Sequence, residues 1–454
     1  MSDVTDEDER VARPATLPGR TLLVEPSPWD RRRDGRALVL LFLFVWVLFL
    51  ATASYTVDQV NDSRETALAA WSLGTRGTLA LPEDWQQWPD ALRWDVEGVD
   101  GHTYTNRFPG SILWGAPFYA VGEVVSPTHP VPHPWLGPFA PAGVAAATVT
   151  ALAVGVCFAV YRRLAERRLA LAAALTVGLG TGLWSVAADA LWTHGPAALT
   201  LALGMLALSS RRYAGTGAAF GVAILVRPQL AVVPAVTGLW HGWRERSLRP
   251  VVTVGVISAL GLAAMSLYSQ ALFGTWLPVA GYSEGRVTAV VTTGGAEFSE
   301  RLLHAFINPA RGVFIYTPLL LILLPGVVRG YRAAPAWVRS AALAGVVYFI
   351  VQFRANTWHG GRDFFGNRLA LETLVLISPL MLVTFRRVLS GTRFGRRLVT
   401  AVAVGSIGLH ALGATVWQTG LLGYDGPPTW HRNISELCEE EPEVCADYDG
   451  PWGS

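Results

Sequence analysis

The chain contains no lysine: all 36 of its basic residues are arginine, and it is rich in alanine and glycine. We interpret this bias as the codon usage of a high-GC bacterium, such as an actinobacterium, and it carries no information about activity. Charged residues make up only 15% of the sequence, whereas 51% of the residues are hydrophobic and lie in long blocks. This pattern argues against a water-soluble core and predicts one all-α polytopic membrane domain.

The N-terminal segment 1–35 lacks the apolar core of a secretory signal, and the first apolar run has no small-residue cleavage site. We therefore expect a disordered cytoplasmic tail over 1–35 and an uncleaved membrane anchor after it. The transmembrane domain is predicted to cover 36–421, followed by an acidic extracytoplasmic tail over 422–454.

Apolar segments predict about eleven transmembrane helices. The pair 214–227 and 229–243 is short and turns at Arg227-Pro228, as expected for helices that end inside a protein-lined cavity. The predicted spans are 37–55, 138–161, 169–188, 195–210, 214–227, 229–243, 250–272, 312–329, 340–354, 369–385 and 397–421.

Arginine counts predict the orientation of these helices in a plasma membrane. The segments between spans on the side of the N-terminus, with 31–36 before the first span, hold 21 arginines and three acids, whereas the opposite segments hold 12 arginines and 23 acids. These inner segments are 31–36, 161–168, 211–212, 244–249, 329–339 and 386–397. Because positive residues favour the cytoplasmic side, the N-terminus is predicted to lie inside and the C-terminus outside.

Cysteine is scarce, with three residues in the chain. Cys157 lies within a predicted span and is best explained as a small buried apolar residue. Cys438 and Cys445 lie in the outer tail, where an oxidising compartment would allow a disulfide bond between them.

The longest predicted outer loop, 56–137, contains two segments with the composition of interfacial helices. The first begins near Asp62 or Ser63, either of which suits a helix N-cap, and the second follows Arg107 and Pro109. Two such helices between the first and second spans can cover a cavity that opens both to lipid and to the periplasm.

Polar residues in the other outer segments are predicted to converge on that cavity. Taken singly, each has a structural explanation: an Asp can cap a helix, an Arg can reach lipid headgroups, and a Trp can belong to the interfacial belt. Glu372 differs because it lies inside the tenth predicted span, where an ionisable group usually faces a cavity or a partner such as arginine.

An acidic residue after the first span is followed by five motifs in a fixed order. The acid is Asp58 or Asp62, and the motifs are DGHTYTNRFPGSILWGAPFYAVGE (100–123), GVAILVRPQLAVVPA (221–235), LFGTWLPVAGY (272–282), ARGVFIYTPLLLILLPG (310–326) and WHGGRDFFGNRLALETLVLISP (358–379). In this order they resemble the GT-C superfamily of polyprenyl-phosphate-dependent glycosyltransferases, in the branch of dolichyl-phosphate-mannose mannosyltransferases and lipid A sugar transferases. The resemblance covers about 55–380 and departs from the family pattern at Asn106-Arg107-Phe108-Pro109, where a Lys and a Pro pair are common.

The resemblance implies an inverting transfer of a sugar from a polyprenyl-phosphate donor to a glycan, lipid or protein acceptor. A carboxylate on the outer face would remove the proton from the acceptor hydroxyl, and Asp62 is preferred over Asp58 because it starts the predicted helix. Asp189 is the second candidate carboxylate, which would orient the acceptor or base, or bind a divalent metal with His194. No ligand set is close enough in the sequence to assign a metal.

The remaining candidate site residues are arginines for the donor phosphate and polar or aromatic residues for the substrate. Arginine suits phosphate because its planar fork binds two oxygens and stays charged. The phosphate-binding candidates are Arg311, Arg368, Arg227 and Arg362, and the substrate-binding candidates are Arg107, His194, Tyr282, Trp358 and His359.

Two other functions fit a polytopic protein with charged groups in an outer cavity. A transporter is one alternative, but the sequence shows no internal repeat and no matched pair of interrupted helices. A non-catalytic partner in envelope assembly is the other, because of the departure around Arg107. We expect the lipid bilayer as a partner and no nucleic acid.

The predicted orientation can be tested with alkaline phosphatase fusions, because this reporter is active only where its disulfides form. A fusion after Gly420 should be active and a fusion after Arg397 inactive, with both measured at equal expression. The reverse pattern would contradict both the orientation and an active site on the outer face.

Overall fold

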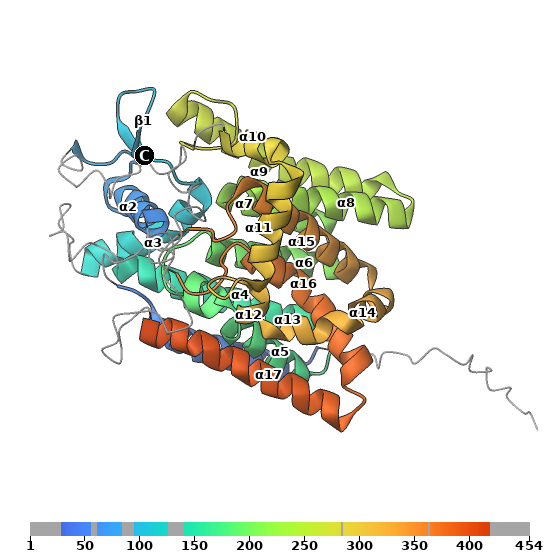
Figure 1. The fold of residues 1–454 in the computed structure, drawn as a ribbon. Coiled ribbons are helices and arrows are strands. Elements are labelled where there is room, and N and C mark those ends of the chain that lie inside the picture. Colours follow the sequence, from blue (N-terminus) through green and yellow to red (C-terminus); the bar gives the residue numbers. More distant parts are fainter. Residues whose placement is uncertain are drawn as a thin grey trace, which may run out of the picture.

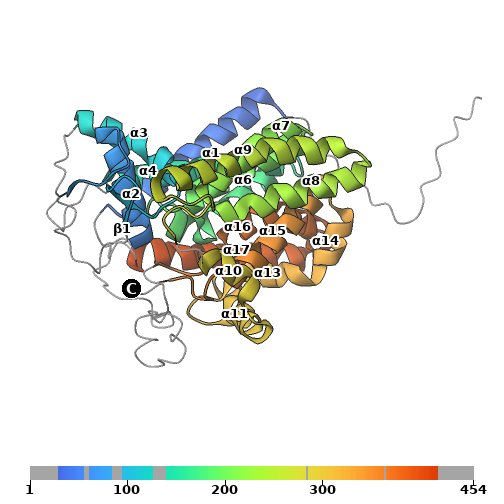
Figure 2. The same cartoon turned by 90° about the horizontal axis from the view of Figure 1, so that it is seen from above.

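Helices form nearly all of the computed structural model, which describes residues 29–55, 61–83, 95–125, 140–282, 285–361 and 364–417. Figures 1 and 2 show the helices gathered into one bundle. Its α-helices are α1 (Arg31–Thr52), α2 (Asn61–Arg76), α3 (Pro109–Val125), α4 (Ala140–Arg162), α5 (Arg167–Leu179), α6 (His194–Ser209), α7 (Tyr213–Val226), α8 (Val232–Glu245), α9 (Leu248–Phe273), α10 (Gly285–Thr292), α11 (Gly295–Ile307), α12 (Val313–Tyr316), α13 (Pro318–Leu323), α14 (Val327–Ala333), α15 (Ala336–Ala355), α16 (Leu371–Thr384) and α17 (Arg393–Leu412).

The predicted all-α membrane fold is confirmed. Among the described residues, five helices are long and apolar enough to cross a membrane: α1, α4, α9, α15 and the helix that begins at Arg393. Helices α6 and α7 are apolar but shorter, and the chain turns between α7 and α8 at Arg227 and Pro228, as predicted. Each of the eleven predicted spans contains helix, and their number in a membrane stays a prediction.

Two predicted spans are interrupted. The span 312–329 is divided into α12, α13, the 3-10 turn η5 (Leu324–Gly326) and α14. Pro318 and Pro325 explain the divisions, because proline lacks a backbone N–H and clashes with the preceding turn. The span 169–188 breaks after α5 at Gly180 and resumes as the π-helix η3 (Leu183–Ala187).

Helix α4 lies at the centre of the bundle, and 16 of its 23 residues are buried. Cys157 on this helix is 1% exposed, so its predicted burial is confirmed. At the end of α4, Arg162 donates two hydrogen bonds to Asp34 of α1, at 3.1 and 2.9 Å. Arg167 of α5 adds a third at 2.7 Å, so one buried carboxylate joins three helices.

The two predicted helices of the first outer loop are α2 and α3, which lie together at one end of the bundle in both views (Figures 1 and 2). They pack against each other and α4, with Trp71, Ile112 and Tyr119 in a shared core. A Cβ on Gly74 would lie only 2.4 Å from the Ala116 carbonyl oxygen, so this close packing requires glycine. The helix expected at the membrane surface is therefore largely covered by protein.

A short hairpin precedes α3. Strands β1 (Asp95–Glu97) and β2 (Thr103–Thr105) are antiparallel, with Val96 opposite Tyr104. The sequence signal for the hairpin is its Asp-Gly pair, because Gly101 adopts a positive φ of 79°. The Val99 N–H also bonds to the Leu272 carbonyl oxygen at the end of α9. The hairpin thereby connects the first outer loop to the segment that follows α9.

Candidate functional site

Asp62 lies in the first turn of α2, and its carboxylate is bound by two arginines from distant segments. Arg107 Nη1 is 2.5 Å from Asp62 Oδ1, and Arg368 Nη1 is 2.7 Å from Asp62 Oδ2. The Asp62 side chain is 25% exposed, whereas those of Arg107 and Arg368 are 4% and 12% exposed. The carboxylate is thus the more accessible member of a largely buried charge cluster.

Arg107 is fixed on the turn that leads into α3. Its guanidinium also donates a hydrogen bond to the Tyr282 hydroxyl, and its backbone carbonyl accepts one from the Tyr268 hydroxyl at 3.2 Å. Glu65, one turn along α2 from Asp62, is fully buried and adds a negative charge near Arg107. The sequence predictions included Arg107 and Tyr282 but missed Glu65, which has no distinguishing motif.

Arg368 is held by the loop that joins α15 to α16. Its Nε donates to the Gly360 carbonyl at 2.7 Å, and its guanidinium carbon lies 4.6 Å from the centre of the Trp192 ring and 4.8 Å from that of Phe364. Gly360 has a φ of 71°, which glycine adopts without strain and which lets the loop fold back onto the arginine. The aromatic faces orient the guanidinium plane and leave its edge toward Asp62.

A second charge cluster lies beside the first. Glu372 of α16 is fully buried, and its Oε1 accepts a hydrogen bond from Arg227 Nη1 at 2.9 Å. His194 Nδ1 is 2.8 Å from the same oxygen and 3.1 Å from Arg227 Nη1. Burial lowers the pKa of the Arg368 guanidinium, and the charge of Arg227 acts in the same direction. The charges of the two clusters therefore influence each other.

Arg311 occupies a different position from the other phosphate-binding candidates. Its side chain is completely buried, and its guanidinium donates to the backbone carbonyls of Phe364 and Gly366. The guanidinium carbon also lies 4.0 Å from the centre of the Phe364 ring. In this structure Arg311 supports the loop that carries Arg368, a placement that the sequence motif did not predict.

The other predicted site residues are arranged around this centre. Trp358 stacks on His304 of α11 with ring centres 5.0 Å apart, and His359 Nδ1 accepts a hydrogen bond from the Gly361 N–H. The Asp189 carbonyl accepts from the Ser54 N–H just after α1, and burial raises the pKa of its carboxyl to about 8. Asp58, Arg362, Cys438 and Cys445 lie outside the described residues.

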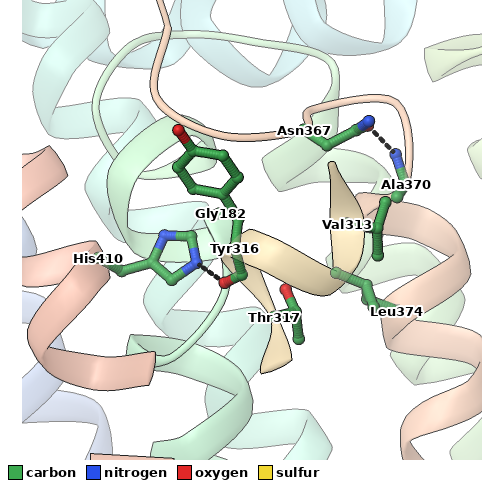
Figure 3. A pocket seen from close by; sticks show the side chains of 8 residues that line it. All are labelled: Gly182, Val313, Tyr316, Thr317, Asn367, Ala370, Leu374 and His410. Carbon is green, nitrogen blue, oxygen red and sulfur yellow. Dashed lines mark hydrogen bonds between the residues drawn. The ribbon is translucent and has the colours of Figure 1, made fainter. Parts of the chain in front are cut away.

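A cavity of about the size of one water molecule lies behind the turn 367–370 (Figure 3). His410 of α17 points into it, and His410 Nε2 donates to the Tyr316 carbonyl at 2.8 Å, so Nδ1 accepts from the Ser185 hydroxyl. The Asn367 side-chain oxygen accepts from the Ala370 N–H. These bonds fix the turn that leads into α16.

In the parts of the chain that the structure describes, no group of three His, Cys, Asp or Glu side chains is placed to hold a metal ion. Both oxygens of Asp62 bond to arginine, and His194 bonds to Glu372. A divalent ion bound by Asp189 and His194 therefore stays a prediction, and we assign no residue to a metal.

No protein-family model and no curated protein sequence matches this chain. Its fold is similar to that of the Archaeoglobus fulgidus oligosaccharyltransferase in complex with Zn and sulfate, with a TM-score of 0.53 and 15% identity. The match covers 87% of this chain and 54% of the archaeal enzyme, so the chain spans about half the length of that protein.

Two further structures align with lower TM-scores. Oligosaccharyltransferase AglB from the same archaeon, in complex with an inhibitory peptide and a dolichol-phosphate, gives 0.48 with 13% identity over 88% of this chain and 57% of its own. ArnT from Cupriavidus metallidurans, bound to undecaprenyl phosphate, gives 0.45 with 18% identity over 90% and 73%. The first comparison shows that the fold is similar to that of an oligosaccharyltransferase, and fold similarity alone does not establish activity.

The buried pair of Glu372 and Arg227 should show strong energetic coupling. Glu372→Gln leaves the Arg227 charge without its carboxylate, so the free energy of unfolding should fall by about 3 kcal/mol. Adding Arg227→Met removes the stranded charge and should recover part of that loss. Unfolding of the single and double variants in mixed detergent micelles measures this coupling, and simple additivity of the two changes would contradict it.

Proposed function

We propose that the chain is a membrane glycosyltransferase that moves a sugar from a polyprenyl-phosphate donor to an acceptor on the outer face of the plasma membrane. The proposal rests on the Asp62 carboxylate at the start of α2, which bonds to both Arg107 and Arg368. The fold is shared with an enzyme that transfers oligosaccharides. The acceptor belongs to the glycans, lipids or proteins of the cell envelope.

The arginines supply the groups that a lipid-phosphate leaving group needs. As the bond between the sugar and the phosphate breaks, negative charge grows on the phosphate, and fixed cations in a water-poor site stabilise it. The charge of Arg227 lowers the pKa of Arg368, so the two guanidiniums repel each other. A phosphate placed between them would relieve this repulsion. Their planar forks can each bind two phosphate oxygens.

Asp62 is the proposed general base. When the donor phosphate takes hydrogen bonds from Arg368, it competes with Asp62 for that guanidinium and releases Oδ2. The freed oxygen can then accept the proton of the acceptor hydroxyl while that hydroxyl attacks the anomeric carbon. The attacking oxygen bonds to the sugar, the bond to the phosphate breaks, and the lipid phosphate leaves with the electron pair.

The other candidates take supporting roles in this proposal. Arg107 stays bound to Asp62 Oδ1 and orients the carboxylate, while Tyr282 orients Arg107. Arg311 is a positioning residue, because it holds the loop of Arg368 through the carbonyls of Phe364 and Gly366. Trp358 and His359 lie on the same loop and are assigned to substrate binding in this proposal.

The proposal is tested most directly by Asp62→Asn. Asparagine retains the shape of the side chain but has almost no proton affinity, so transfer should slow by at least about a hundredfold. Asp58→Asn should have the smaller effect. Transfer is measured with purified protein, radiolabelled polyprenyl-phosphate sugars and envelope extract as the acceptor source.

Normal transfer by Asp62→Asn together with loss of transfer by Asp58→Asn would move the base to the earlier acid. Normal transfer by both variants would remove this segment from catalysis. Uptake or export by vesicles that contain the wild-type protein, without transfer, would instead support a transporter.

Arg368→Lys should also abolish most of the transfer, although the side chain keeps its positive charge. An ammonium group cannot make the fork contacts to phosphate, and it lacks the flat surface that packs on Trp192 and Phe364. Arg301→Lys on α11 is a matched control because Arg301 bonds to Glu297 and to backbone carbonyls. Full activity in Arg368→Lys would limit Arg368 to a structural role.

A further inference from the structure

Gln352 on α15 has a buried side chain whose hydrogen bonds are not satisfied within the described chain. Its relative exposure is 0%, and neither its amide nitrogen nor its amide oxygen has a hydrogen-bond partner among the described residues. Its backbone carbonyl is used, because it accepts from both the N–H and the side chain of Asn356. An unpaired amide in a protein interior is costly, so a bound ligand or water molecule is a common explanation for such a group.

The packing of α15 against α16 shows what this amide lies beside. A Cβ on Gly345 would lie 3.0 Å from the Leu376 Cβ, and one turn further along α15, Tyr348 interacts with Glu372, one turn back along α16. The two helices are therefore antiparallel, and each turn along α15 corresponds to one turn back along α16. Gln352, one turn beyond Tyr348, falls level with Arg368, which lies one turn before Glu372.

The turn before α16 continues this register. The Leu371 N–H bonds to the Arg368 carbonyl, so the chain makes a tight turn there, just before α16 begins at Leu371. Tyr348, one turn before Gln352 on α15, also interacts with Arg227. The register therefore places Gln352 on the side of α15 that faces the two arginines assigned to the donor phosphate. A group bonded to that phosphate would come within reach of the amide.

We infer that Gln352 binds the sugar of the lipid-linked donor through hydrogen bonds to its hydroxyl groups. This inference rests on the proposed function. An amide offers two donors and one acceptor oxygen on one flat group, which suits neighbouring sugar hydroxyls. A phosphate has only acceptors at neutral pH, and arginine serves it better. Gln352 therefore contributes to the choice of sugar, while the arginines hold the phosphate that all such donors share.

The test compares wild-type protein with Gln352→Met, which keeps the length of the side chain and removes its hydrogen bonds. The probes are undecaprenyl phosphate and undecaprenyl phosphate linked to mannose, glucose, galactose or arabinose, and the dissociation constant of each is measured in detergent. Wild-type protein should bind at least one sugar-linked lipid more tightly than undecaprenyl phosphate. Gln352→Met should weaken that preference about tenfold and leave undecaprenyl phosphate binding unchanged.

Gln270→Met is the matched control, because it makes the same chemical change on α9 and should retain the sugar preference. Without lipid, Gln352→Met should melt at the wild-type temperature or above it, since an unpaired buried amide is lost. A melting temperature several degrees lower would show that Gln352 supports the fold and would overturn the inference.

Two binding results would also overturn it and differ in what they say about the enzyme. If Gln352→Met keeps the full sugar preference, the inference fails while the proposed function stands. If wild-type protein binds none of the five lipids, the proposed function fails as well.

Discussion

The ion pairs of Asp62 with Arg107 and Arg368 join three segments that are far apart in the sequence. Asp62 begins α2, Arg107 precedes α3, and Arg368 ends the loop before α16. All three groups lie in a largely nonpolar helical domain, where an unpaired charge is much more costly than in water. The packing of the two outer helices and the folding of the loop must therefore bring these charges together.

The same need to pair buried polar groups explains the contacts that support Arg368 and its loop. Arg368 donates to the Gly360 carbonyl and packs on two aromatic rings, and Arg311 donates to the carbonyls of Phe364 and Gly366 in the same loop. The two guanidiniums thereby satisfy backbone carbonyls that the irregular loop would otherwise leave without donors. A loop built this way holds a guanidinium within a narrow range of positions, as a phosphate site requires.

The two neighbouring clusters also suggest how binding and chemistry can be coupled. Arg227 is paired with Glu372 deep in the bundle, and Arg368 is paired with the more exposed Asp62. Under the proposed function, an incoming phosphate would meet the more exposed Arg368 pair first and replace the Asp62 carboxylate there. The released carboxylate would be the proposed general base, which the protein without donor holds in an inactive pair.

Local sequence features were sufficient for the class of fold and for much of the site. Apolar blocks predicted the helices, because membrane spans must satisfy their own backbone and be apolar over their full length. Asp62, Arg107, Arg227, Arg368 and Tyr282 could be selected because charged and polar groups are rare in such a chain and followed a known order of motifs. Glu372 could be predicted to face a partner from its position within a span.

Tertiary structure alone decided how those residues are used. Arg311 and Arg368 had the same predicted role in phosphate binding, yet one is buried against backbone carbonyls and the other reaches Asp62. Gln352 and Glu65 resemble any other polar residue in the sequence, and their significance comes from the helix facing them. Pairing between distant groups depends on the register of packed helices, and no local pattern of amino acids encodes that register.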